Sequence, residues 1–219
     1  MVPYYSDDHV TLYHARWEDV PPDLLRADVL VTDPPYGIGW KVGASAAAHR
    51  KPHAGIVNDE DTSSRDAMLE SVGGIPGVVF GSFYAPFPDN VRQVLVWHKP
   101  GDAGLVGSVT GYRRDAEPIF LTGTWPIRTV EWSSVLRTMA GQSGTVTETG
   151  HPHTKPVSLL VNLINRCPPG TILDPYAGSG TTLVAAKSLG RRAIGVECVE
   201  RYCEVAANRL RQEVLGLVA

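Results

Sequence analysis

The last third of the chain most constrains the fold, because short apolar runs alternate there with helical patterns. Residues 171–173 and 193–196 are apolar runs of strand length, and each is followed by a segment with helical spacing. A glycine-rich turn follows the first run, and Gly190 is placed to end the intervening helix. A strand–helix–strand–helix unit of this kind forms parallel strands joined by a right-handed crossover. The pattern therefore predicts an α/β fold with a mainly parallel sheet.

Similar patterns predict further strands and helices along the rest of the chain. Strands are expected at residues 9–13, 27–32, 78–80 and 94–97, with a weaker candidate at 117–121, which contains a proline. Helices are expected over residues 61–70 and from Pro156 onward, where apolar residues recur at helical spacing. Residues 37–58 predict a mobile loop and residues 122–150 a short irregular insertion. We expect residues 1–219 to form one domain.

Composition excludes several classes of protein. The 219 residues are 43% hydrophobic and 20% charged, which suits a single globular domain. The net charge of −3 argues against coating nucleic acid by bulk charge, although residues 41–53 are locally basic. No apolar stretch is long enough to span a bilayer. The three cysteines form no CxxC pair, which indicates reduced thiols in a cytoplasmic setting, and we expect Cys198 and Cys203 to be buried and unreactive.

The turn after residues 171–173 has the features of a cofactor site. Its sequence runs Asp174-Pro175-Tyr176-Ala177-Gly178-Ser179-Gly180-Thr181-Thr182. The glycines allow a ligand to approach the backbone, and a helix start offers free N–H groups. Glu197 ends the next strand, where an acid accepts hydrogen bonds from ribose hydroxyls. Because neither a P-loop lysine nor GxGxxG is present, the pattern favours an adenosine-bearing cofactor without a pyrophosphate; the alternative is a plain tight turn.

A second string, Asp33-Pro34-Pro35-Tyr36, ends the apolar run at residues 29–32. Proline stops the strand and leaves a carboxylate and an aromatic ring at its carboxyl end. Asp33 and the carbonyl of Pro34 offer two acceptors for an exocyclic amine, and Tyr36 offers a ring on which a base can stack. The alternative interpretation is a strand-ending β-turn, which Asp-Pro commonly begins.

Taken together, these strings resemble the amino-group DNA methyltransferases that use S-adenosylmethionine, in their permuted arrangement. Asp33-Pro34-Pro35-Tyr36 matches the catalytic DPPY, residues 151–156 resemble HPTQKP, and residues 174–182 are similar to DPFxGSGTT. The resemblance implies a Rossmann-like domain with a seven-stranded sheet and a circularly permuted motif order. It implies methyl transfer to the N6 amine of adenine in DNA after base flipping, with N4 of cytosine as the alternative. A non-catalytic DNA- or cofactor-binding protein of this fold is the alternative from another class.

The resemblance also assigns roles to individual residues. The catalytic set is Asp33, Pro34, Pro35 and Tyr36, and the set expected to bind the cofactor is His151, Lys155, Asp174, Tyr176, Gly178, Ser179, Gly180, Thr181, Thr182, Glu197 and Cys198. The usual Gly-Asp before the catalytic strand is missing, so Trp17 or Asp19 is the candidate contact to the cofactor's adenine. We expect no metal and no membrane association. DNA is the expected partner, and by analogy with the family we expect a homodimer. The sequence leaves open whether a restriction nuclease accompanies the protein.

Overall fold

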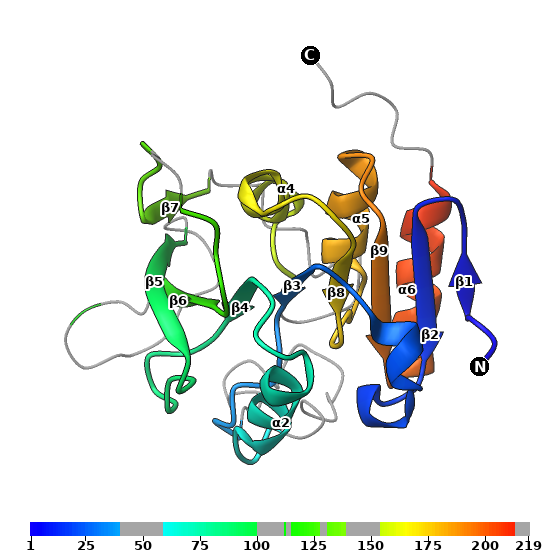
Figure 1. The fold of residues 1–219 in the computed structure, drawn as a ribbon, viewed down its shortest axis with the longest axis horizontal. Helices are drawn as coiled ribbons and strands as arrows, with labels where there is room; N and C mark the ends of the chain where they lie inside the picture. Colours follow the sequence, from blue (N-terminus) through cyan, green and yellow to red (C-terminus); the bar gives the residue numbers. More distant parts are fainter. Residues whose placement is uncertain (40–58, 100–111, 113–114, 128–130, 139–153, 213–219) are drawn as a thin grey trace, which may run out of the picture.

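The computed structural model describes residues 1–39, 59–99, 112, 115–127, 131–138 and 154–212. Within them a nine-stranded sheet is flanked by helices (Figure 1). The strands are β1 (Tyr5–Ser6), β2 (Val10–His14), β3 (Val29–Thr32), β4 (Gly77–Phe80), β5 (Val91–His98), β6 (Ala116–Thr122), β7 (Val135–Arg137), β8 (Ile172–Asp174) and β9 (Ala193–Glu197). The helices are α2 (Ser63–Ser71), α4 (Val157–Arg166), α5 (Thr181–Ser188) and α6 (Glu200–Arg211), with two 3₁₀ turns, η1 (Trp17–Asp19) and η2 (Pro22–Leu25).

The sheet has the order β1-β2-β9-β8-β3-β4-β6-β5-β7. The run from β2 to β4 is parallel, whereas β6 is antiparallel to both of its neighbours. The α/β class with a mainly parallel sheet is therefore confirmed, but the expected seven strands are wrong. The two extra strands lie at the edges and span two and three residues, so they are too short for alternation to reveal them.

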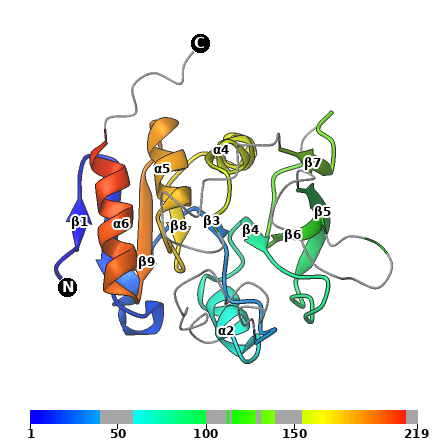
Figure 2. The same cartoon turned by 180° about the vertical axis from the view of Figure 1, so that it is seen from behind.

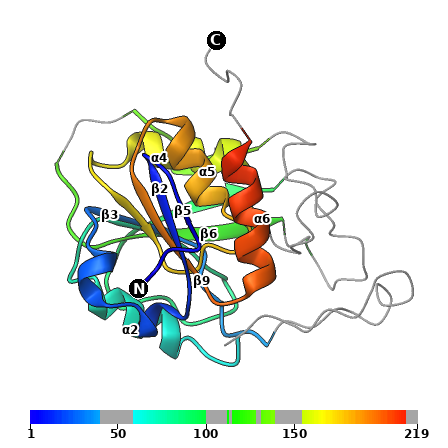
Figure 3. The same cartoon turned by 90° about the vertical axis from the view of Figure 1, so that its right-hand side faces the viewer.

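Helices cover both faces of the sheet, and the side chains of β3 show how. Val29 and Val31 pack in the core that includes α4, α5 and α6, whereas Leu30 packs with Met68 of α2 on the opposite face. Figures 2 and 3 show α2 on one side of the sheet and the three carboxyl-terminal helices on the other. All four residues of β3 are buried, as expected of a parallel strand covered on both faces.

The proline-containing candidate at residues 117–121 is a central strand, β6. The carbonyl of Pro118 accepts a hydrogen bond from the backbone N–H of Gly81, on the β4 side. The last residue of β4, Phe80, pairs with Ile119, so Pro118 lies beyond the end of that ladder. Because N–H and C=O of one strand residue point the same way, the proline removes no donor from the β5 ladder. A central strand therefore tolerates it.

Two segments expected to be irregular are described only in part. Of the loop at residues 37–58, residues 37–39 are described, and the backbone N–H groups of Gly37 and Gly39 donate to Asp59. Within residues 122–150, β7 adds a parallel edge strand beside β5, which the irregular composition did not indicate. The basic residues 41–53 lie outside the described residues. No helix in the described part of the chain is long and apolar enough to cross a membrane.

Candidate active site

The two strings that the sequence singled out leave the sheet side by side. β3 and β8 are parallel neighbours, so their carboxyl ends meet at the same edge. Thr32, the last residue of β3, donates from Oγ1 to Oδ1 of Asp174, the last residue of β8, over 2.7 Å. Both side chains are buried. This contact joins the Asp33 string to the glycine-rich turn although 142 positions separate the two residues.

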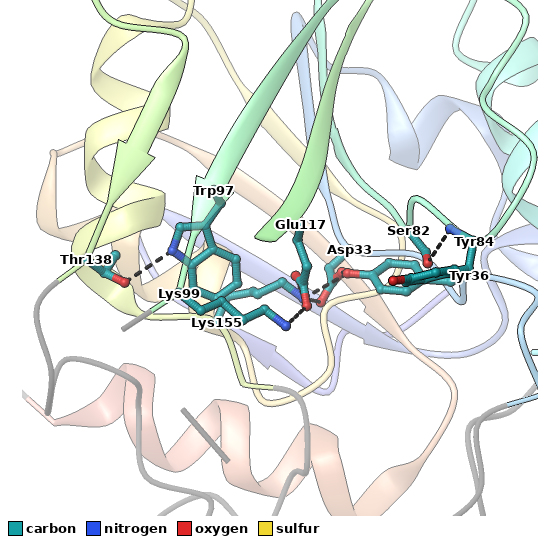
Figure 4. Close-up of polar contacts among 9 residues, drawn as sticks. All are labelled: Asp33, Tyr36, Ser82, Tyr84, Trp97, Lys99, Glu117, Thr138 and Lys155. Carbon is teal, nitrogen blue, oxygen red and sulfur yellow. Dashed lines mark hydrogen bonds and ion pairs between the residues drawn. The ribbon is translucent and has the colours of Figure 1, made fainter. Parts of the chain in front are cut away.

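Asp33 is held on both of its carboxylate oxygens (Figure 4). The hydroxyl of Tyr36 donates to Oδ1 over 2.7 Å, and the ammonium of Lys155 donates to Oδ2 over 2.6 Å. Lys155 Nζ also lies 3.0 Å from the Tyr36 oxygen. The structure therefore brings Lys155, expected at the cofactor, against the residues expected to be catalytic.

Two charged residues that sequence reasoning missed extend this cluster. Glu117, beside Pro118 on β6, places Oε2 3.6 Å from Lys155 Nζ, and its Oε1 forms an ion pair with Lys99. The lysine follows β5, which pairs with β6. In the sequence, one charged residue beside each of two apolar strand patterns is only a weak signal of a shared site. Residues 100–116 separate Lys99 from Glu117 in sequence, and local spacing does not show that the two side chains meet.

Burial and charge set the protonation states of the cluster. Burial alone would lower the pKa of Lys155, but the carboxylates of Asp33 and Glu117 outweigh it and raise that pKa. Burial and the same two carboxylates hold the pKa of Tyr36 well above its usual value. At neutral pH Lys155 is therefore an ammonium and Tyr36 a neutral hydrogen-bond donor.

The glycine-rich turn between β8 and α5 has a constrained backbone. Gly178 and Gly180 have φ of 52° and 79°, in the left-handed region that favours glycine. A Cβ at Gly180 would lie 2.7 Å from the Cβ of Ala206 in α6, so that helix packs directly on the turn. Arg209 of α6 donates to the carbonyl of Ser179 over 2.6 Å and to Oγ1 of Thr181 over 3.1 Å. The turn is thus shaped by both flanking helices.

Glu197, at the end of β9, faces this turn. Its Oε2 accepts from the backbone N–H of Gly178 over 2.8 Å and its Oε1 from that of Val199 over 2.7 Å. Burial raises the pKa of the Glu197 carboxyl, although the backbone donors oppose this.

The neighbouring Cys198 is exposed, so its expected burial is wrong. The reason is that β9 ends at Glu197, and Cys198 lies just outside the buried strand. Desolvation of the thiol and the Glu197 charge still raise the pKa of Cys198 to about 11, which keeps the thiol protonated.

The remaining residues of the turn make contacts within the protein. Asp174 is 2% exposed, and burial raises its pKa to about 6 although Thr182 and Thr32 donate to it. The hydroxyl of Tyr176 lies 2.6 Å from that of Ser64 in α2, and burial raises the pKa of Tyr176 to about 12. Thr181 and Thr182 begin α5 and are buried.

Trp17 also reaches this region, since its indole N–H donates to Ser64 over 3.4 Å. Asp19 is exposed in η1. Trp17 and Asp19 stay predicted contacts to the cofactor's adenine. His151 lies outside the described residues. Among the described residues, no group of three or more histidine, cysteine or acidic side chains is arranged to hold a metal ion.

Comparisons with known proteins agree with this arrangement. A family model described as DNA methylase, N6_N4_Mtase, matches residues 97–208, just over half of the chain. The type II methyltransferase M.ScaI of Streptomyces caespitosus is 26% identical over 98% of this chain and 86% of its own length. The putative methylase YubD of Escherichia coli K12 is 48% identical, but over only 27% of each chain.

Solved structures share the fold. The crystal structure of the M1.HpyAVI–SAM complex superposes with a TM-score of 0.66 at 22% identity, covering 92% of this chain and 99% of that one. The PvuII DNA methyltransferase, described as cytosine-N4-specific, gives 0.63 at 15% identity and covers 98% and 90%. The site joins a DPPY string to a glycine-rich turn on such a sheet, and the family model spans half the chain. The chain therefore belongs to the N6/N4 family of DNA methylases.

Proposed function

We propose that this chain transfers a methyl group from S-adenosylmethionine to the exocyclic N6 amine of adenine in DNA. S-adenosylmethionine supplies the electrophilic methyl group. The observation that carries the proposal is the junction of β3 and β8, where Thr32 bonds Asp174 over 2.7 Å. At this junction the Asp33 string and the glycine-rich turn share one edge of the sheet. Because α/β proteins bind ligands at such edges, this supports an amine site beside a cofactor site.

The Asp33 string is suited to hold an amine. An exocyclic amine is a weak nucleophile because its lone pair is delocalised into the ring, and acceptors on its N–H bonds favour attack. Asp33 is one acceptor: a carboxylate has about four acceptor sites, and two are taken by Tyr36 and Lys155. The Pro34 carbonyl is the second acceptor. The Tyr36 ring supplies a stacking surface for a base rotated out of the duplex.

The residues of the turn fit the cofactor. A side chain at Gly180 would collide with α6, and the left-handed φ of Gly178 and Gly180 leaves backbone where a cofactor needs close approach. Glu197 keeps acceptor capacity beyond its two backbone donors and is placed for ribose hydroxyls. We propose that Ser179 and the first turn of α5 complete this half of the site. Asp174 and Tyr176 shape it from within, and Cys198 borders it.

The proposal extends to the organisation and setting of the chain. We propose that residues 1–219 form a single catalytic domain acting on DNA in the cytoplasm of a bacterium or of a phage-infected cell. Homodimer formation and the contribution of His151 to the methionine end of the cofactor stay predictions. The relative M.ScaI is a type II methyltransferase, which supports a place in restriction–modification.

The test is transfer of a tritiated methyl group from S-adenosylmethionine to unmethylated DNA, followed by digestion to nucleosides. Label in N6-methyladenosine supports the proposal, and label in N4-methylcytosine replaces the base while keeping the reaction. Long-read sequencing of DNA from cells that express the protein gives the methylated base and its site together.

The substitution that tests Asp33 is Asp33→Asn, which keeps the shape of the side chain and removes its charge. We expect transfer to fall by about 1,000-fold, since loss of one preorganised electrostatic contact costs about 10²–10³, while binding of S-adenosylmethionine stays within about threefold. Transfer that persists in Asp33→Ala would remove the proposed role of Asp33. Absence of transfer in every protein, wild type included, would favour a non-catalytic binding protein.

A further inference from the structure

Among the described residues, Lys155 is the most deeply buried cation of the cluster around Asp33. Its side chain is 8% exposed, and its ammonium contacts Asp33 at 2.6 Å and Tyr36 at 3.0 Å, with Glu117 at 3.6 Å. The same nitrogen lies 5.0 Å from the centre of the Phe80 ring and 5.5 Å from that of Tyr36. Two aromatic rings and two carboxylates therefore lie around one buried positive charge. Figure 4 shows the Tyr36 ring and the two carboxylates beside Lys155.

Two carboxylates compete for this ammonium, and they are not equally satisfied. Asp33 accepts from Lys155 on Oδ2 and from Tyr36 on Oδ1. Oε2 of Glu117 is buried and has no hydrogen-bond partner among the described residues, although it faces Lys155 within ion-pair distance. A buried acceptor without a donor is costly. A small movement of the ammonium from Asp33 toward Glu117 would satisfy it.

The residue before Lys155 contacts the glycine-rich turn through its side chain. Oγ1 of Thr154 lies 3.4 Å from Oγ of Ser179, and the next residue reaches Asp33. Pro156 then caps α4, whose buried leucines anchor this segment in the core. Two consecutive residues thus bridge the glycine-rich turn and the catalytic string.

We propose that Lys155 is a positioning residue for Asp33 rather than a cofactor ligand, and that Glu117 is the reserve acceptor for its ammonium. This inference rests on the proposed function, because it concerns the same Asp33. Lys155 holds the Asp33 carboxylate in its orientation before the amine arrives. When the amine donates to Asp33, the ammonium moves toward Oε2 of Glu117 and leaves Asp33 free to accept. No proton is transferred when the ammonium moves.

The test compares Lys155→Met, Lys155→Arg and Glu117→Gln with Lys187→Met in the full chain. Lys187 is the matched control because its ammonium also pairs with a carboxylate, Asp7, at 2.7 Å, away from the Asp33 cluster. We expect Lys155→Met to lower kcat by about 100-fold, as expected of a misplaced reacting group. Lys155→Arg should recover part of the loss, and Glu117→Gln should lower kcat by about tenfold.

Binding of S-adenosylmethionine separates positioning from cofactor binding. We expect the Kd of S-adenosylmethionine to stay within about threefold of wild type in all four variants. If Lys155→Met raises the Kd of S-adenosylmethionine tenfold or more and leaves kcat unchanged, Lys155 is a cofactor-binding residue and not a positioning residue. A wild-type kcat in Glu117→Gln would contradict the role of Glu117 as reserve acceptor.

A measurement without turnover separates this inference from the proposed function. The carboxyl carbon signal of Asp33 is followed by NMR at neutral pH in wild type, Lys155→Met and Lys187→Met. Loss of the hydrogen bond from Lys155 to Oδ2 should shift this signal in Lys155→Met, whereas Lys187→Met should leave it unchanged. An unshifted signal in Lys155→Met would overturn the positioning role even in an active enzyme. A shifted signal without methyl transfer in wild type would contradict the proposed function alone.

Discussion

Asp33 follows β3 and Glu197 ends β9, so both lie at the carboxyl ends of parallel strands in one sheet. Their hydrogen-bond partners differ in kind. Asp33 is held by side chains, the ammonium of Lys155 and the hydroxyl of Tyr36. Glu197 is held mainly by backbone N–H groups, those of Gly178 and Val199, with Cys198 as a further hydrogen-bond partner. The proposed catalytic half of the site is therefore held by charged and polar side chains, whereas the proposed cofactor half is held mainly by its main chain.

This difference predicts how each half responds to substitution. Removal of a charge should alter the catalytic half with little effect on the fold, because the side chains there can rearrange. The cofactor half should tolerate charge changes better than changes of backbone conformation, since its geometry depends on glycine and on the packing of α6. The substitutions below sharpen or break this contrast.

The largest effect is expected from Gly180→Ala, with Gly190→Ala as its matched control. Both glycines have positive φ, but an added Cβ at Gly180 meets Ala206 at 2.7 Å, whereas at Gly190 it meets nothing within 4 Å. We expect Gly180→Ala to lower the free energy of unfolding by about 3 kcal/mol and Gly190→Ala by about 1 kcal/mol. Urea denaturation measures both. Equal losses would show that packing of α6 does not shape the turn.

The next effect concerns Asp174, whose pKa burial raises to about 6. The folded state then holds a proton that the unfolded state has released, so stability falls as pH rises from about 4 to about 6. In Asp174→Asn this loss is absent, and the variant should gain about 2–3 kcal/mol on wild type between pH 4 and pH 7. Unfolding in urea across this range gives the difference. A gain that does not change with pH would contradict the assigned cause.

A smaller effect is expected from Glu197→Gln. The amide keeps one acceptor oxygen, so one of the two backbone N–H groups loses its partner, at a cost of about 1–2 kcal/mol. We expect the Kd of S-adenosylmethionine to rise about tenfold with kcat nearly unchanged. Calorimetry and single-turnover kinetics measure the two separately. A fall in kcat with an unchanged Kd would place Glu197 in the catalytic half.

The smallest effect is expected from Asp7→Asn, outside both halves. Burial would raise the pKa of Asp7, but hydrogen bonds from Lys187 and Tyr5 outweigh it and lower that pKa strongly. The stabilisation is present above the usual pKa of an aspartate and is lost as pH falls below it. We expect the variant to lose about 1 kcal/mol at pH 7 and to keep its kcat. A changed kcat would mean that this pair is coupled to the site.

Much of the fold was readable from local pattern, and the reason is physical. Buried parallel strands such as β3 and β8 are continuous apolar runs bounded by proline or glycine, so their position follows from the chain alone. The edge strands β1 and β7 were missed because their stability comes from the neighbouring strand. The exposure of Cys198 was missed for a similar reason, since it depends on where β9 ends.

The sequence by itself determined the α/β class, the two functional strings and the chemistry that their residues offer. Only the tertiary structure decided which side chains share a site. Lys155 stands near the cofactor string in sequence, yet its long side chain reaches Asp33, and Glu117 meets Lys99 across a hairpin. Short-range spacing encodes strands and turns, whereas contacts between distant charges depend on sheet order and on the reach of side chains. The partner of a buried charge is therefore the property that local pattern leaves open.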